Sequence, residues 1–252
     1  MFDLRLIRAD VLKLRRRRGM LALSFILTLG IVALIAGVAA IRHAGNPLEH
    51  RPAGGVMAYK DSMFVLTLMM LVVGTIVGAT AGAQDLESGV FRDLAATGRS
   101  RLALLGSRVP GACAIVLPIA GLAAAAVAIA GLALADGGIS PDAAMIFAAT
   151  AGVLTTGALT AIVAVGLAAL TGSKAAVIAT MLGFNLALAP LLSGIAWLGD
   201  ARHAIAPNAL YRIGHTANEG VDMGLITAIV VVIAWAAAAF AAGAWRTQAR
   251  EI

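Results

Sequence analysis

Few side chains in this sequence have the types and spacing that chemistry needs. The segment TGSK at 171–174 comes nearest to a phosphate-binding loop, but it lacks the upstream glycine and the Ser or Thr after the lysine. No two histidines stand four residues apart, and the only cysteine, Cys113, lies in an apolar run. The histidines are His43, His50, His203 and His215. The sequence therefore predicts no catalytic residue, no metal site and no nucleotide site in this chain.

The densest charge lies in residues 82–101, GAQDLESGVFRDLAATGRSR, whereas the twenty residues before it carry none. Leu86, Val90 and Leu94 recur every four residues, and no proline interrupts 85–96, which predicts a short amphipathic helix. Such a helix fits a groove on another protein or a lipid surface, and the pattern alone does not favour either. The charged residues are Asp85, Glu87, Arg92, Asp93, Arg99, Arg101 and, just past the segment, Arg108.

A second amphipathic pattern lies at the N-terminus, in residues 1–19. Its apolar residues recur at spacings of three, four and three, and most of the basic residues lie off that stripe. This pattern predicts an elbow helix that lies in the membrane interface and turns into the first apolar run. The stripe consists of Leu4, Ile7, Val11 and Leu14.

The elements that position these segments are membrane spans. Of the 252 residues, 61% are hydrophobic and only 13% are charged, about half the charged fraction of a soluble domain. Six apolar runs each reach the roughly 20 residues that a helix needs to cross a bilayer. The sequence thus predicts a single all-α transmembrane domain. The predicted spans are 20–41, 63–83, 109–135, 143–170, 175–198 and 224–245.

The basic residues predict the orientation of the spans. Of the 19 lysines and arginines, fourteen lie on the side that holds both termini, and five lie on the other side. Basic loops stay in the cytoplasm, so we expect both termini and the connection 84–108 there, and the loop 199–223 outside. The basic cluster abuts the first span, where it sets topology and meets anionic lipid, so we expect no nucleic-acid partner.

The spans themselves contain no Asp, Glu, Lys, Arg or His. Ion-coupled transporters and intramembrane enzymes need such groups at membrane depth, so energy for any uphill transport must enter from outside the membrane. Asn185 is the only amide in the spans, and Gly74, Gly78 and Gly82 form a stripe of small residues. We expect these four residues to serve helix packing or the translocation path.

The chain resembles the permease subunit of an ATP-binding-cassette transporter, of the type 2 exporter membrane-domain family. The likeness covers the elbow, the six spans and above all DLESGVFRDLAATGRSRLALLGSR at 85–108. Val90 stands where threonine is frequent in the family. The loop 199–223 is similar to the partly re-entrant segment that precedes the last span in the family. The positions that match the family's pattern are Glu87, Gly89, Arg92, Gly98, Arg101 and Arg108.

The resemblance implies that this loop carries a coupling helix that docks on a soluble ATPase subunit, present in two copies. ATP and Mg²⁺ would then bind in that partner, and a second permease copy, identical or related, would complete the channel in a bacterial plasma membrane. Glu87 is expected to face a cleft in the ATPase. A membrane scaffold or sensor subunit is the alternative, and nothing in the sequence selects a drug, peptide or lipid as cargo. The coupling residues would be Asp85, Leu86, Glu87, Gly89, Val90, Arg92 and Arg101.

Overall fold

The computed structural model describes residues 4–96, 98, 100–214 and 223–249, with Phe91, Arg92 and Ala95 described by their backbone only. Of the described residues 87% are helical, and none of them lies in a strand. Within the described part of the chain, six helical segments are long and apolar enough to cross a membrane. The predicted fold class, an all-α membrane protein with six spans, is therefore confirmed.

The spans are helices whose ends differ from those of the apolar runs. The second begins eight residues before the predicted 63–83 and ends four residues after it, while the fifth ends at Gly194 instead of residue 198. The spans are, in order, α2 with η1 and α3 (Arg18–Phe25, Ile26–Gly30, Ile31–Gly45), α4 (Gly55–Glu87), α6 (Arg101–Ala133), α7 (Ala143–Thr171), α8 with η2 and α9 (Lys174–Gly183, Phe184–Leu188, Ala189–Gly194) and α11 (Leu225–Ala249).

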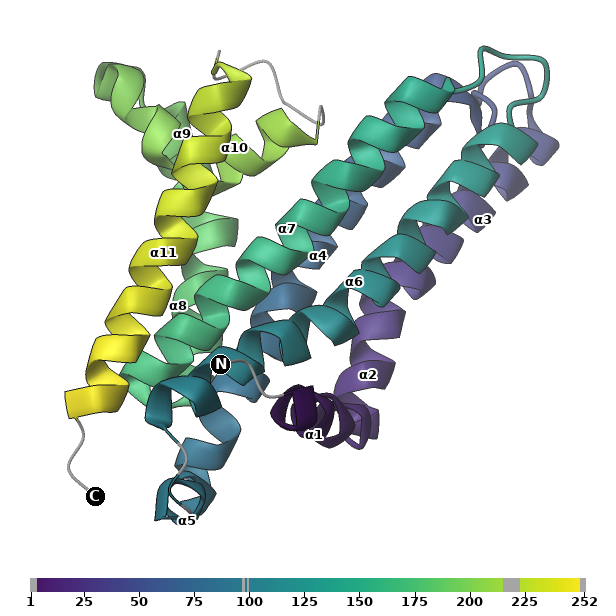
Figure 1. The fold of residues 1–252 in the computed structure, drawn as a ribbon. Helices are drawn as coiled ribbons and strands as arrows, with labels where there is room; N and C mark the ends of the chain where they lie inside the picture. Colours follow the sequence, from purple (N-terminus) through teal and green to yellow (C-terminus); the bar gives the residue numbers. More distant parts are fainter. Residues whose placement is uncertain (1–3, 97, 99, 215–222, 250–252) are drawn as a thin grey trace.

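The centre of the bundle is the pair α4 and α7, which run side by side with α6 and the first span on one flank and α8 and α11 on the other (Figure 1). The predicted glycine stripe faces α7. A Cβ atom on Gly74, Gly78 or Gly82 would lie 2.4–2.9 Å from the nearest atom of α7. The absence of side chains therefore lets the two backbones approach closely, which increases van der Waals contact between membrane helices.

The predicted elbow is the helix α1 (Leu4–Arg15), which is seen nearly end-on in Figure 1 and so lies across the spans. Its apolar stripe becomes more buried along the helix. Leu4 is 69% exposed, Ile7 and Val11 are half-buried, and Leu14 is 2% exposed. The short helix α5 (Val90–Ala96) and the C-terminal end of α11 lie at the same end of the bundle as α1. We call this end the basal end.

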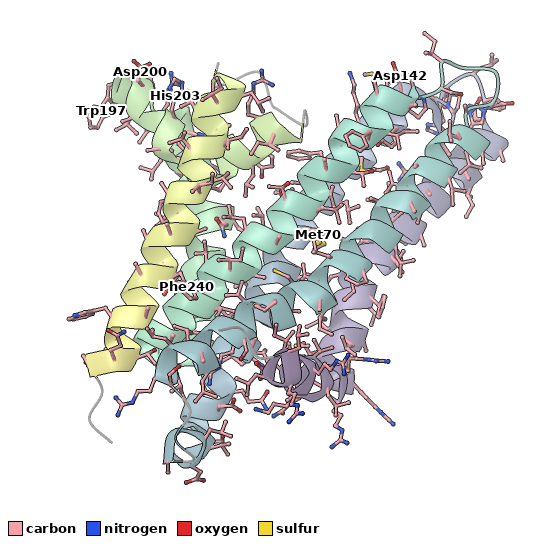
Figure 2. The ribbon with its side chains drawn as sticks, viewed as in Figure 1. Met70, Asp142, Trp197, Asp200, His203 and Phe240 are labelled. Carbon is pink, nitrogen blue, oxygen red and sulfur yellow. The ribbon has the colours of Figure 1, made fainter. Side chains whose placement is uncertain are left out.

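The segment between α9 and α11, predicted as an external loop at 199–223, lies at the opposite end of the molecule. It holds the 3₁₀ helix η3 (Ala196–Ala204) and the helix α10 (Ala206–Ile213). Leu210 of α10 is buried, and the indole nitrogen of Trp235 in α11 donates a hydrogen bond to the carbonyl of Ala204 at 2.9 Å. Trp197, Asp200 and His203 point away from the bundle at its tip (Figure 2). Residues 215–222, with His215, lie outside the described residues.

The first and fifth spans are each interrupted by one π-helical turn, η1 and η2. The residue buried in each turn is polar, Thr28 in η1 and Asn185 in η2. The Thr28 hydroxyl donates a hydrogen bond to the carbonyl of Ser24 at 2.8 Å, so its polar group is satisfied within its own helix. Asn185 is 7% exposed, in keeping with a place between helices.

Candidate functional site at the basal end

The charged segment 85–96 is not one helix. The helix α4 continues to Glu87, and α5 begins at Val90 after a break at Ser88 and Gly89. Gly89 has a φ of +76°, a left-handed conformation that glycine adopts without strain and that commonly ends a helix. The predicted continuous amphipathic helix is therefore wrong. Leu86 belongs to the last turn of α4 and does not share a helix face with Val90 and Leu94.

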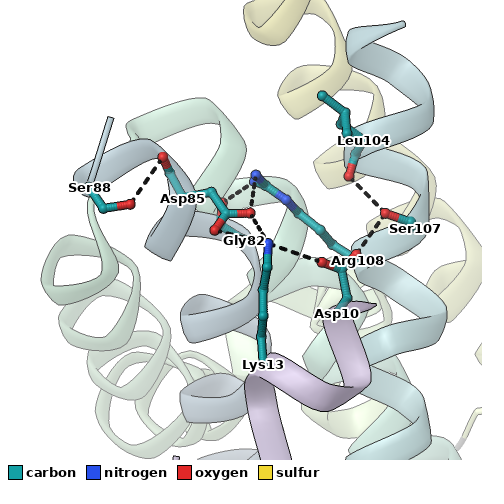
Figure 3. Close-up of polar contacts among 8 residues, drawn as sticks. All are labelled: Asp10, Lys13, Gly82, Asp85, Ser88, Leu104, Ser107 and Arg108. Atoms are coloured by element: carbon teal, nitrogen blue, oxygen red, sulfur yellow. Dashed lines mark hydrogen bonds and ion pairs between the residues drawn. The ribbon is translucent and has the colours of Figure 1, made fainter. Parts of the chain in front are cut away.

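The break places Asp85 inside the protein, in a cluster of charged groups shown in Figure 3. Asp85 is 8% exposed. The ammonium of Lys13, from α1, donates to its two carboxylate oxygens at 3.0 and 3.3 Å, and the Arg108 guanidinium, from α6, lies 3.4 Å from one of them. The sequence had suggested that Asp85 contacts a partner protein. In the structure two internal cations engage its carboxylate instead.

Arg108 is the most deeply buried charge of the cluster, with 2% of its surface exposed. Its Nη1 donates a hydrogen bond of 2.6 Å to the carbonyl of Gly82, while Nη2 faces Asp85. Both acceptors belong to the last turns of α4, the helix end that carries partial negative charge. Arg108 therefore joins the start of α6 to the end of α4 at two points.

A second carboxylate, Asp10 of α1, faces the same helix α6. The Ser107 hydroxyl donates to its Oδ2 at 2.7 Å, and the Lys13 ammonium lies 3.8 Å from its Oδ1. A Cβ atom on Gly111 would lie 2.9 Å from the Cβ of Asp10, so a glycine there lets α1 reach α6. Burial raises the pKa of Asp10, although the bond from Ser107 and the nearby cations oppose that shift.

The two carboxylates should therefore respond differently to neutralisation. Because its folded-state pKa is raised, Asp10 contributes less to stability as the pH rises through that value. We expect Asp10→Asn to change the free energy of unfolding by less than about 1 kcal/mol, because an amide oxygen still accepts from Ser107. Asp85→Asn should cost more, because it leaves the buried Arg108 without a counter-charge. Unfolding titrations of both variants would test this, and equal losses would contradict it.

The remaining residues of the predicted coupling site lie on the surface around α5. Val90 is 40% exposed, and Asp93 is exposed. The Oε1 atom of Glu87 accepts a hydrogen bond of 2.6 Å from the backbone N–H of Lys174, at the start of α8. Arg101 is half-buried and donates to the carbonyl of Gln248 in α11 at 3.2 Å. The structure describes Arg92 by its backbone only.

The cluster Asp10, Lys13, Asp85, Ser107 and Arg108 is hereafter called the basal clamp. It ties the elbow to both helices that flank α5, so a displacement of the α5 loop acts on all three. Its pairs between different helices are 23 to 97 positions apart, so sequence reasoning missed them. In the described ranges no three His, Cys, Asp or Glu side chains lie close enough to hold a metal. The interactions of the basal clamp join α1, α4 and α6.

Neither a scan against models of protein families nor a search of the curated proteins found a match to this chain.

Proposed function

We propose that this chain is the membrane-spanning permease subunit of an ATP-driven exporter of the ATP-binding-cassette class. It would form the translocation path with a second permease copy and couple to a separate ATPase subunit, which would bind the ATP and Mg²⁺. The setting would be a bacterial plasma membrane. The proposal rests on the resemblance of residues 85–108 and on the six-span architecture that begins with an elbow helix.

The observation that supports this proposal most strongly is the position of α5 between α4 and α6. The helix projects at the basal end, between two long spans (Figure 1). Those spans, α4 and α6, are joined at the same end of the bundle by Arg108. Because α4 also packs closely along α7, a push on α5 would move the centre of the bundle as one body. A protein that receives mechanical work from a cytoplasmic partner needs such a rigid connection.

A membrane scaffold or sensor subunit remains the second candidate, since it too could present α5 to a partner. The two functions differ in what the partner does after binding. Purification of the chain together with the soluble protein encoded beside it would distinguish them. An exporter should recover an ATPase in two copies, and its ATP hydrolysis should respond to transported compounds. A partner without ATPase activity would favour the scaffold.

The surface of α5 offers the sharpest test of docking. We expect Val90→Glu to weaken binding of the ATPase partner about tenfold or more, because a carboxylate would replace an apolar side chain in the contact. The fold should not change, since Val90 is 40% exposed and surface substitutions usually alter stability by less than about 0.5 kcal/mol. Affinity of the detergent-solubilised variant for the immobilised partner is the measurement.

The matched control is Leu48→Glu, the same kind of substitution at a leucine that is 99% exposed near the opposite end of the bundle. It should leave partner binding unchanged. If Val90→Glu binds the partner as well as the control does, α5 is not the docking element.

A further inference from the structure

A cleft of about 360 Å³ opens at the basal end between the first, second and fifth spans. Its volume is about ten times the roughly 30 Å³ that one water molecule occupies in the liquid, so it can hold a polar headgroup. The lining residues come from the start of α2, the last turns of α4 and the start of α8. They are Arg17, Gly19, Met20, Thr80, Gln84, Glu87 and Lys174.

The charges around the cleft favour an anion. Arg17 and Lys174 are basic, and within the described residues neither side chain makes a hydrogen bond or an ion pair. The only carboxylate of the lining, Glu87, already accepts the hydrogen bond from the Lys174 amide. Arg16 and Arg18, beside Arg17, are both exposed and add positive potential. Two uncommitted cations at the mouth of one cleft form a site for a phosphate or carboxylate group.

The position of the cleft places that anion at headgroup depth. Three lining elements have their ends there, because α2 begins at Arg18, α8 begins at Lys174 and α4 ends at Glu87. The basic residues predict that this end faces the cytoplasm, where the leaflet carries anionic lipids. A ligand from that leaflet could therefore enter the cleft sideways without leaving the membrane.

Above the cleft, α4 offers an apolar surface for a lipid tail. Thr80, Ile76, Val72 and Met69 follow one another at spacings of four, four and three, and the last three are only half-buried. This face lies opposite the glycine stripe that packs on α7. From Thr80 to Met69 it rises about 16 Å along the helix, close to half of the roughly 30 Å hydrocarbon thickness. An acyl chain in one leaflet has the length to cover it.

We propose that this cleft binds a phosphate-headed, anionic lipid, with the phosphate between Arg17 and Lys174 and an acyl chain along the half-buried face of α4. The site belongs to the chain itself, and the proposal does not depend on the exporter function proposed above.

Native mass spectrometry of the purified chain with equal amounts of phosphatidylglycerol and phosphatidylcholine tests the site. We expect one phosphatidylglycerol per chain to be retained in preference to phosphatidylcholine. Arg17→Gln with Lys174→Gln should reduce that preference about tenfold, since each basic residue near a membrane surface contributes to anionic-lipid binding. The matched control, Arg8→Gln with Arg246→Gln, removes the same charge from exposed positions outside the cleft and should keep the preference.

Three further results decide the proposal. Gln84→Trp fills the cleft without changing its charge and should also abolish the retained lipid, and a wild-type lipid signal in this variant would place the site elsewhere. Equal losses in the cleft and control variants would show unspecific attraction to basic residues and would overturn the site. Displacement of the lipid by millimolar inorganic phosphate alone would show an anion site without a contribution from the tail, which would overturn the lipid assignment.

Discussion

Replacement of Arg108 by leucine is expected to lower the free energy of unfolding by about 3–5 kcal/mol, the usual cost of removing one partner of a buried ion pair. The loss has two sources. Asp85 would keep only Lys13, which is partly exposed to solvent, and the carbonyl of Gly82 would lose its 2.6 Å hydrogen bond. Because the same guanidinium joins α4 to α6, we also expect α5 to lose its fixed position and partner binding to weaken.

Reversible unfolding of the detergent-solubilised protein in a denaturant titration measures this effect. Arg246→Leu removes an exposed arginine from the same end of the bundle and should change stability by less than about 0.5 kcal/mol. Adding Asp85→Leu to the Arg108 variant should recover part of the loss, because the unpaired carboxylate is then also removed. A loss below about 1 kcal/mol for Arg108→Leu would show that the basal clamp does not hold the two spans together.

Gly78→Leu is expected to separate the two central helices. A Cβ atom at Gly78 would lie 2.4 Å from the carbonyl oxygen of Ala161 and 2.8 Å from the Cβ of Ala164. The first neighbour is a backbone atom and the second is a Cβ atom, so no side-chain rotation can move either of them away. Overpacking of this kind typically costs about 1–3 kcal/mol, and we expect Gly78→Leu to reach at least the upper end. Gly78→Ala should already lower the melting temperature measurably.

The matched control is Gly37→Leu in α3, where an added Cβ atom would meet no other atom within 4 Å. Leucine forms helices better than glycine by about 0.8–1 kcal/mol, so this variant should be unchanged or slightly more stable. Thermal unfolding followed by size-exclusion chromatography compares the two. If Gly78→Leu unfolds at the same temperature as Gly37→Leu, that result would contradict the close approach of α4 and α7.

The spans and the elbow could be predicted from the sequence because both depend on local patterns. An apolar run of sufficient length has few alternatives to a membrane helix, and the stripe that ends at Leu14 follows helical spacing. The helix ends could not be predicted in the same way. Hydropathy marks only where apolar residues stop. The helix α6 starts eight residues before the predicted 109, because Ser100 caps it. The Ser100 hydroxyl accepts a hydrogen bond from the Ala103 amide at 3.2 Å.

The basal clamp could not be predicted, because its partners come from three helices and no local pattern joins them. Lys13 lies off the apolar stripe of the elbow, yet its ammonium contacts the buried Asp85 inside the bundle. The break at Gly89 does have a signal in the sequence. A glycine just past a charged helix end is a frequent stop, and that possibility competed with the spacing of the leucines and valine.

The π-turns of the first and fifth spans have a consequence for the periodicity of those spans. Residues of an α-helix follow one another at about 100°, so positions four apart drift by about 40° around the axis with every step. The buried positions of both spans nevertheless recur at strict intervals of four. They are Ser24, Thr28 and Val32 in one span and Val177, Met181, Asn185 and Ala189 in the other.

A wider turn in the middle of each series takes up part of this accumulated drift and returns the later positions toward the same side of the helix. Thr28 and Asn185 mark the place of that correction. A series of buried residues with a period of four that has a polar residue near its middle thus indicates where the helix phase is corrected, in a span that hydropathy alone treats as uniform.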